Sequence, residues 1–86
     1  MTIFKFPLAI TDEQTVLVGD RKAKALHVEE QDGILMLWVM LDRDYMTGPH
    51  KMFVQIVGTG NEFMPQSDYV GTAKMSNGLV WHVFAD

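Results

Sequence analysis

Residues 31–41 read QDGILMLWVML, and this stretch decides the class of fold. The pair Asp32-Gly33 precedes eight uninterrupted apolar residues, 34–41, and Asp42 follows them. Asp-Gly is a strong signal for a tight hairpin turn, because glycine tolerates the positive φ that such turns need. A bounded run of this length favours a strand over a buried helix, which usually needs about ten residues or more.

A strand that is apolar on both faces is predicted to be the central strand of its sheet. In so short a chain, the second face is covered either by a sheet that curls around it or by another copy of the chain. The apolar content of 48% also requires that many side chains are buried, either inside the monomer or between copies of the chain. We therefore expect a homo-oligomer. The predicted interface residues are Leu35, Leu37, Trp38 and Trp81.

Strand patterns extend outward from this run in both directions. Apolar residues alternate in TIFKFPL (2–8), where Pro7 predicts an edge strand because it cannot donate a ladder hydrogen bond. A second hairpin signal, Asn77-Gly78, joins two further strand-like segments. No segment carries a helical stripe. The pattern predicts an all-β fold: a small antiparallel sandwich or barrel of about seven short strands, with bulges or bends at Gly58 and Gly71.

The length, the composition and the net charge of the chain argue against several classes of function. Residues 1–86 form one predicted domain without cysteine. The net charge of −4 argues against nucleic-acid or anionic-membrane binding, where a basic footprint provides most of the affinity. No basic segment leads into an apolar run and no 18-residue apolar window exists, so we expect neither a signal peptide nor a membrane span. We expect a cytosolic protein.

The residues that could carry catalysis or bind metal do not form recognised patterns. His27, His50 and His82 lack metal-ligand spacing, and we interpret His27 and His82 as half-buried strand residues with a backbone partner. The serines, at 67 and 76, lie in loops without the surroundings of a nucleophile. We therefore predict no enzyme, no metal site and no cofactor.

The tripeptide Val-Gly-Thr occurs twice, at 57–59 and at 70–72. Glycine bends can turn successive backbone N–H groups toward one point and form an anion-binding nest. The alternative is structural, because Thr after Gly is common in bulged strands. The candidate ligand-binding residues are Gly58, Thr59, Gly60, Asn61, Tyr69, Gly71 and Thr72. The basic cluster Arg21, Lys22 and Lys24 is interpreted as a solvated turn or as protection of a sheet edge.

The order of motifs along nearly the whole chain resembles a family of small proteins from tailed bacteriophages and prophages. The motifs are IFKFPL, DEQTV, ALHVEEQDG, LWVML, VGTGNE, YVGT and GLVWHVF. The family typically has His-Pro after Gly-Thr-Gly, whereas this chain has Asn61-Glu62, so a role for that histidine does not carry over. The resemblance brings no established activity with it.

The resemblance implies a setting, the host cytoplasm, and two functions. In the first, the protein is a homo-oligomeric binding module that acts on a host pathway, with a small nucleotide used as a defence signal as a candidate ligand. In the second, it is an inhibitor or accessory factor that docks on a bacterial or phage protein through an acidic face or an open sheet edge. A minor virion component is a third option.

Overall fold

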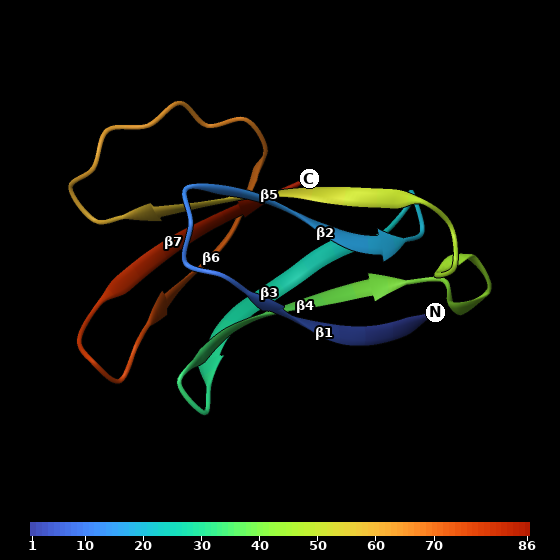
Figure 1. Cartoon of the computed structure of the whole chain (residues 1–86), viewed down its shortest axis with the longest axis horizontal. Coiled ribbons are helices and arrows are strands. Elements are labelled where there is room, and N and C mark those ends of the chain that lie inside the picture. Colours follow the sequence, from blue (N-terminus) through green and yellow to red (C-terminus); the bar gives the residue numbers. More distant parts are fainter.

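The computed structural model describes residues 1–86 and shows seven antiparallel strands in two facing sheets (Figure 1). One sheet has the order β1-β4-β3 and the other the order β2-β5-β7-β6. The predicted all-β sandwich is confirmed. None of the segments forms a helix long and apolar enough to cross a membrane. The elements are β1 (Thr2–Leu8), β2 (Glu13–Gly19), β3 (Lys24–Gln31), β4 (Ile34–Leu41), the 3₁₀ turn η1 (Arg43–Tyr45), β5 (His50–Gly58), β6 (Asp68–Lys74) and β7 (Val80–Ala85).

Residues 34–41 form β4, the middle strand of the smaller sheet, as predicted. Successive side chains of a strand point to opposite faces, so β4 divides its apolar residues between two environments. Leu35, Leu37, Val39 and Leu41 are buried between the sheets, whereas Ile34, Met36, Trp38 and Met40 face outward and are only half-buried or exposed. The other sheet covers the inner face, and no layer of this chain covers the outer one.

This alternation corrects part of the predicted interface. Leu35 and Leu37 are 1% and 0% exposed and belong to the core of the monomer, so neither is available to a second copy. Trp38 does lie on the outer face, where its ring centroid is 5.7 Å from that of His27. Trp81 is half-buried and packs against the core.

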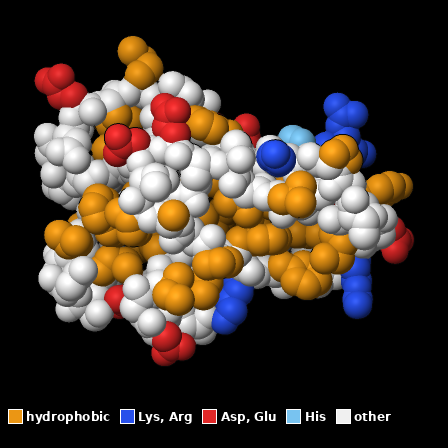
Figure 2. Space-filling view, viewed as in Figure 1, with side chains coloured by type: hydrophobic (Ala, Val, Ile, Leu, Met, Phe, Trp, Pro, Cys, Tyr) orange, Lys and Arg blue, Asp and Glu red, His pale blue; other side chains and the backbone are white.

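The core lies between the two layers, which Figures 1 and 2 show edge-on. Hydrophobic side chains form a continuous band between the layers in the space-filling view (Figure 2). The largest fully buried side chains are Leu35, Leu37, Val39, Leu41, Met52, Val54 and Val83. They come from the central strands of both sheets, because only those strands have neighbours on both sides.

Two local predictions are confirmed at β1 and at the β3–β4 turn. Pro7 lies in β1, which is an edge strand, so its missing N–H interrupts no ladder. Asp32 and Gly33 have φ values of 53° and 83°, the two positive values that a type I′ hairpin turn requires.

Gly71 lies where the edge strands of the two sheets approach each other. A Cβ atom at Gly71 would lie 3.2 Å from Cγ2 of Val28 in β3, so the absence of a side chain lets β6 pack closely on β3. The register of β6 on β7 also shifts between Tyr69 and Gly71, as predicted for a bulge there. Of the bulge or bend predicted at Gly58, the structure shows a bend: Gly58 pairs with Trp81 in continuous register, ends β5 and accepts the N–H of Asn61 in the turn that follows.

Candidate functional site

Four polar side chains form a continuous hydrogen-bonded row across the outer face of β5, β7 and β6. Thr59 Oγ1 is 2.8 Å from His82 Nε2, and Thr72 Oγ1 is 2.9 Å from His82 Nδ1. The hydroxyl of Tyr69 is 2.6 Å from Thr72 Oγ1. We call Thr59, His82, Thr72 and Tyr69 the hydroxyl–imidazole row.

The bulge in β6 is what assembles this row. In a regular strand, residues 69 and 72 would point to opposite faces, because they are three positions apart. The extra residue accommodated between Tyr69 and Gly71 restores the same face to both. Tyr69 then lies opposite Phe84, and Thr72 lies opposite His82. The bulge in β6 therefore decides whether the hydroxyls of Tyr69 and Thr72 can form a hydrogen bond.

The row has one more donor proton than it has internal hydrogen bonds. A neutral imidazole offers one donor and one acceptor, and each of the three hydroxyls offers one donor. Three bonds use three of these four protons, so one proton remains for a partner outside the row. It is on Thr59 when Nε2 carries the imidazole proton, and on Tyr69 or Thr72 when Nδ1 carries it. The row can therefore present a donor or an acceptor to a ligand at either end.

The loop of residues 59–67, gold to orange in Figure 1, arches over the outer face beside the row. Gln55 of β5 anchors this loop, because its Nε2 donates to the carbonyl of Met64 at 2.9 Å and its Oε1 accepts from the N–H of Gln66. Gln55 is 6% exposed, so these bonds lie away from water. These two hydrogen bonds hold residues 64–66 of the loop against β5.

Aromatic rings continue the site beneath the loop. The ring of Phe84 lies 5.1 Å from that of Phe63 in the loop and 5.5 Å from that of Tyr69, measured between centroids. Both distances fall in the range of favourable aromatic pairs. The phenol of Tyr69 is therefore held by a ring contact on one side and by Thr72 on the other.

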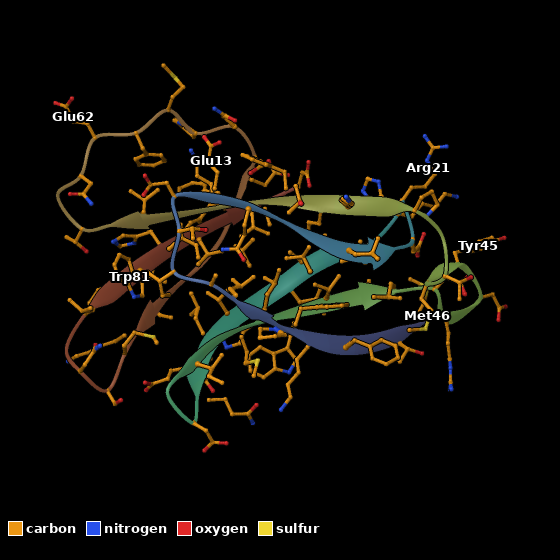
Figure 3. The ribbon with its side chains drawn as sticks, viewed as in Figure 1. Glu13, Arg21, Tyr45, Met46, Glu62 and Trp81 are labelled. Carbon is orange, nitrogen blue, oxygen red and sulfur yellow. The ribbon has the colours of Figure 1, made fainter.

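A cavity of about 620 Å³ lies between this loop and the start of β2, and we call it the loop cavity. Three carboxylates, from Asp12, Glu13 and Glu62, line it, and no Lys or Arg does. Glu13 and Glu62 lie on the same side of the molecule, above the larger sheet (Figure 3). The floor includes Val57, which pairs with His82, so the loop cavity adjoins the hydroxyl–imidazole row.

The structure divides the predicted ligand-binding residues into three groups. Thr59, Tyr69 and Thr72 meet in the row. Gly60 and Asn61 line the loop cavity. Gly58 and Gly71 lie in close packing: a Cβ at Gly58 would lie 3.3 Å from the Trp81 ring, and Gly71 approaches β3. Gly58 also lines a further cavity with Thr59 and Asn61. The N–H of Asn61 donates to the carbonyl of Gly58, so it is occupied in a turn.

His82 is the functional candidate that sequence reasoning missed. Its expected partner was a backbone group, but both ring nitrogens bond to threonine hydroxyls instead. The alternation in VWHVFA was an available signal, since it places residue 82 on the opposite face from buried Val83. The three histidines do not gather, and no group of three or more His, Asp and Glu side chains is arranged to hold a metal ion.

The whole chain, residues 1–86, matches a family model described as a domain of unknown function, DUF7352. No curated protein and no solved structure matches the chain.

Proposed function

The chain belongs to the DUF7352 family of domains of unknown function, and we propose that it is a non-catalytic protein that binds a small, polar ligand. The observation that carries this proposal is the hydrogen-bonded arrangement of Thr59, His82, Thr72 and Tyr69 on an accessible sheet face. The ligand occupies the hydroxyl–imidazole row and the adjoining loop cavity.

The charge around the site selects the chemistry of the ligand. Three carboxylates line the loop cavity and no Lys or Arg offsets them, so the phosphate groups of a nucleotide would be repelled there. A neutral ligand rich in hydroxyl or amide groups, or an amine, matches both the carboxylates and the hydrogen-bonding row. The nucleotide ligand considered from the sequence is therefore disfavoured at this site.

The surroundings of His82 favour binding over nucleophilic catalysis. Thr59 Oγ1 and His82 Nε2 have the spacing of a nucleophile and its base. In a catalytic triad, however, a carboxylate at Nδ1 stabilises the imidazolium that forms. Here the Nδ1 partner is the neutral hydroxyl of Thr72, which provides no such charge.

Ligand titrations followed by two-dimensional NMR test this proposal. The panel contains nucleosides, neutral sugars and polyamines. We expect at least one member to shift the amide signals of Thr59, Thr72 and His82. Thr72→Val keeps the shape of the side chain but removes the shared hydroxyl, so affinity should fall about tenfold for that ligand.

Thr15→Val is the matched control for that titration. It removes an exposed hydroxyl from β2 of the same sheet, outside the row. Its affinity should equal that of the unaltered protein. The proposal fails if no panel member shifts these signals, or if Thr72→Val binds as tightly as the control.

A second candidate function, self-association, is favoured by the uncovered outer face of β1-β4-β3. Half-buried Met36, Trp38 and Met40 form its centre, and Ile3 and Ile34 are 56% and 46% exposed beside them. Polar side chains from β1 and β3 flank these residues on the same face, and an apolar centre with a polar rim is common at interaction sites. This face would place the interface on the side of β4 opposite Leu35 and Leu37.

Sedimentation velocity over a range of concentrations tests self-association. The unaltered protein should be a dimer or larger, and Trp38→Lys should shift it to monomer by placing a charge in the interface. Leu17→Lys is the control, because Leu17 is 60% exposed on the outer face of the other sheet. A monomer at every concentration contradicts a self-association function.

We also propose, from the sequence resemblance alone, that the protein comes from a phage or prophage and acts against a defence pathway in the host cytoplasm. A tagged copy expressed in a bacterial host tests the docking alternative. A bacterial partner that is retained by the unaltered protein and lost with Trp38→Lys would assign the apolar face to docking on another protein.

A further inference from the structure

Cationic side chains gather at the end of the sandwich that is far from the loop cavity. Arg21 and Lys22 from the β2–β3 connection, and His50 and Lys51 at the start of β5, line an open cavity of about 790 Å³. We call this cavity the cationic pocket. Blue and pale-blue side chains cluster over this end, at the upper right of Figure 2. Arg21 and Tyr45 are both labelled there in Figure 3.

The lining of the cationic pocket is positive in a chain that is negative overall. Arg21, Lys22 and Lys51 against the Asp20 carboxylate give +2 with His50 neutral, whereas the whole chain carries −4. None of the three cations forms an ion pair with a carboxylate, since the one ion pair in the structure joins His27 to Glu29. The charge of Lys22 acts in part on Asp20, whereas the charges of Arg21 and Lys51 are available to a ligand.

A buried carboxylate fixes the shape of the pocket. Asp20 is 3% exposed, and its two oxygens accept the backbone N–H groups of Lys22 at 2.9 Å and of Asp42 at 2.8 Å. The bond from Asp42, and then that from Lys22, hold the pKa of Asp20 below its ordinary value. Asp20 thus ties the β2–β3 connection to the end of β4.

Close backbone packing holds the β4–β5 connection, residues 42–49, against the end of β2. Gly19 has a φ of 82°, and a Cβ atom there would lie 1.8 Å from the carbonyl oxygen of Met46. A Cβ at Gly48 would lie 2.5 Å from the carbonyl oxygen of Gly19. The end of β2 and the β4–β5 connection are therefore packed backbone against backbone, so the walls of the pocket are in place before any ligand binds.

We propose that the cationic pocket binds a small phosphate-bearing ligand, of the size and charge of a nucleoside diphosphate. Arg21, Lys22 and Lys51 supply the positive charge and the N–H donors that phosphate oxygens require. The volume lies in the range of small-molecule sites. Tyr45, which also lines the pocket and is 64% exposed, offers a ring for a planar group attached to the phosphates.

This site is independent of the hydroxyl–imidazole row. The pocket residue His50 begins β5, and Thr59 follows its last residue, so about 30 Å of extended chain separates them at ~3.3 Å per residue. The two sites also have lining residues of opposite charge. Failure at one site leaves the other intact.

Calorimetric titration with inorganic pyrophosphate, ADP and adenosine tests the proposal. We expect pyrophosphate and ADP to bind in the same site, and ADP to shift the NMR signals of Tyr45. Adenosine alone should not bind there. Arg21→Gln and Lys51→Gln should each weaken ADP binding about tenfold, because each removes one charged hydrogen-bonding partner.

Lys74→Gln is the matched control, since it removes the same charge from an exposed position on β6, outside the pocket. It should bind ADP as the unaltered protein does. Melting temperatures without ligand should agree among all variants, which separates binding from folding.

Three results would overturn the proposal. The first is that neither phosphate compound binds at millimolar concentration. The second is that Lys74→Gln weakens binding as much as Arg21→Gln does, which would indicate a general charge effect. The third is that a single-stranded oligonucleotide binds with higher affinity and a steeper salt dependence than ADP, which would assign the cations to nucleic acid.

Discussion

Replacing neighbouring residues of β4 by alanine should give very different losses of stability. Leu37 is 0% exposed between the sheets, whereas Met36 faces outward and is only half-buried. Leu37→Ala removes buried methyl groups and leaves a cavity, which costs about 3–4 kcal/mol in a well-packed core. Met36→Ala removes partly solvated atoms and should cost about 1 kcal/mol.

These losses are large for a chain of 86 residues. A domain of this size has a free energy of unfolding of about 4–13 kcal/mol. Leu37→Ala should therefore remove a large part of the total stability and lower the melting temperature by about 12–30 °C. Met36→Ala should lower it by about 4–8 °C.

Urea unfolding followed by far-UV circular dichroism measures both changes. The measurements are repeated at several protein concentrations, because an oligomer would be stabilised by mass action. If the outer face is an interface between copies, the cost of Met36→Ala grows with concentration while that of Leu37→Ala persists when the protein is diluted. Equal costs for the two variants at high dilution would refute the inward–outward assignment of β4.

Two further predictions concern packing and pH. Because backbone donors hold the pKa of Asp20 below its ordinary value of 3.8, its contribution to stability is present above that value and is lost as the pH falls through the folded-state pKa. Urea unfolding is measured at neutral pH and at a series of acidic pH values. At neutral pH, Asp20→Asn should have a lower free energy of unfolding than the unaltered protein. On acidification, its free energy of unfolding should fall by less. Gly71→Ala should cost about 1 kcal/mol, because the new methyl group presses on buried Val28. In a double-mutant cycle this cost should shrink with Val28→Ala, and an unchanged cost would argue against the contact.

The strand content was predictable because its signals are local. The apolar run 34–41, the Asp32-Gly33 turn and Pro7 each restrict the backbone over a few residues, and all three have the structures they predicted. Two of the four residues predicted for an interface between copies are buried in the core of the monomer instead. Leu35 and Leu37 were grouped with Trp38 because a uniformly apolar strand does not reveal which of its faces meets the second sheet.

The candidate site was predicted in part. The repeated Val-Gly-Thr directed attention to Thr59 and Thr72, whose hydroxyls bond to the same imidazole. The sequence did not identify His82 as their common partner, because that depends on β7 lying between β5 and β6. For Gly58 and Gly71 the sequence left a ligand site and a structural role open, and the structure shows close packing at both positions.

The basic residues illustrate the same limit. Arg21 and Lys22 are neighbours in sequence and were interpreted as a solvated turn. Lys51 and His50 lie almost thirty positions further on, and the pairing of β2 with β5, which sets Gly19 opposite His50, brings them to the same cavity.

The sequence by itself determined that this chain forms short antiparallel strands with tight turns, because alternation and turn chemistry act between residues close along the chain. Tertiary structure alone decided which side chains share a surface. Strand order, the bulge in β6 and the contact between Gly19 and Met46 are set by packing between distant segments. Those non-local contacts place the hydroxyls around His82 and the cations around the cationic pocket.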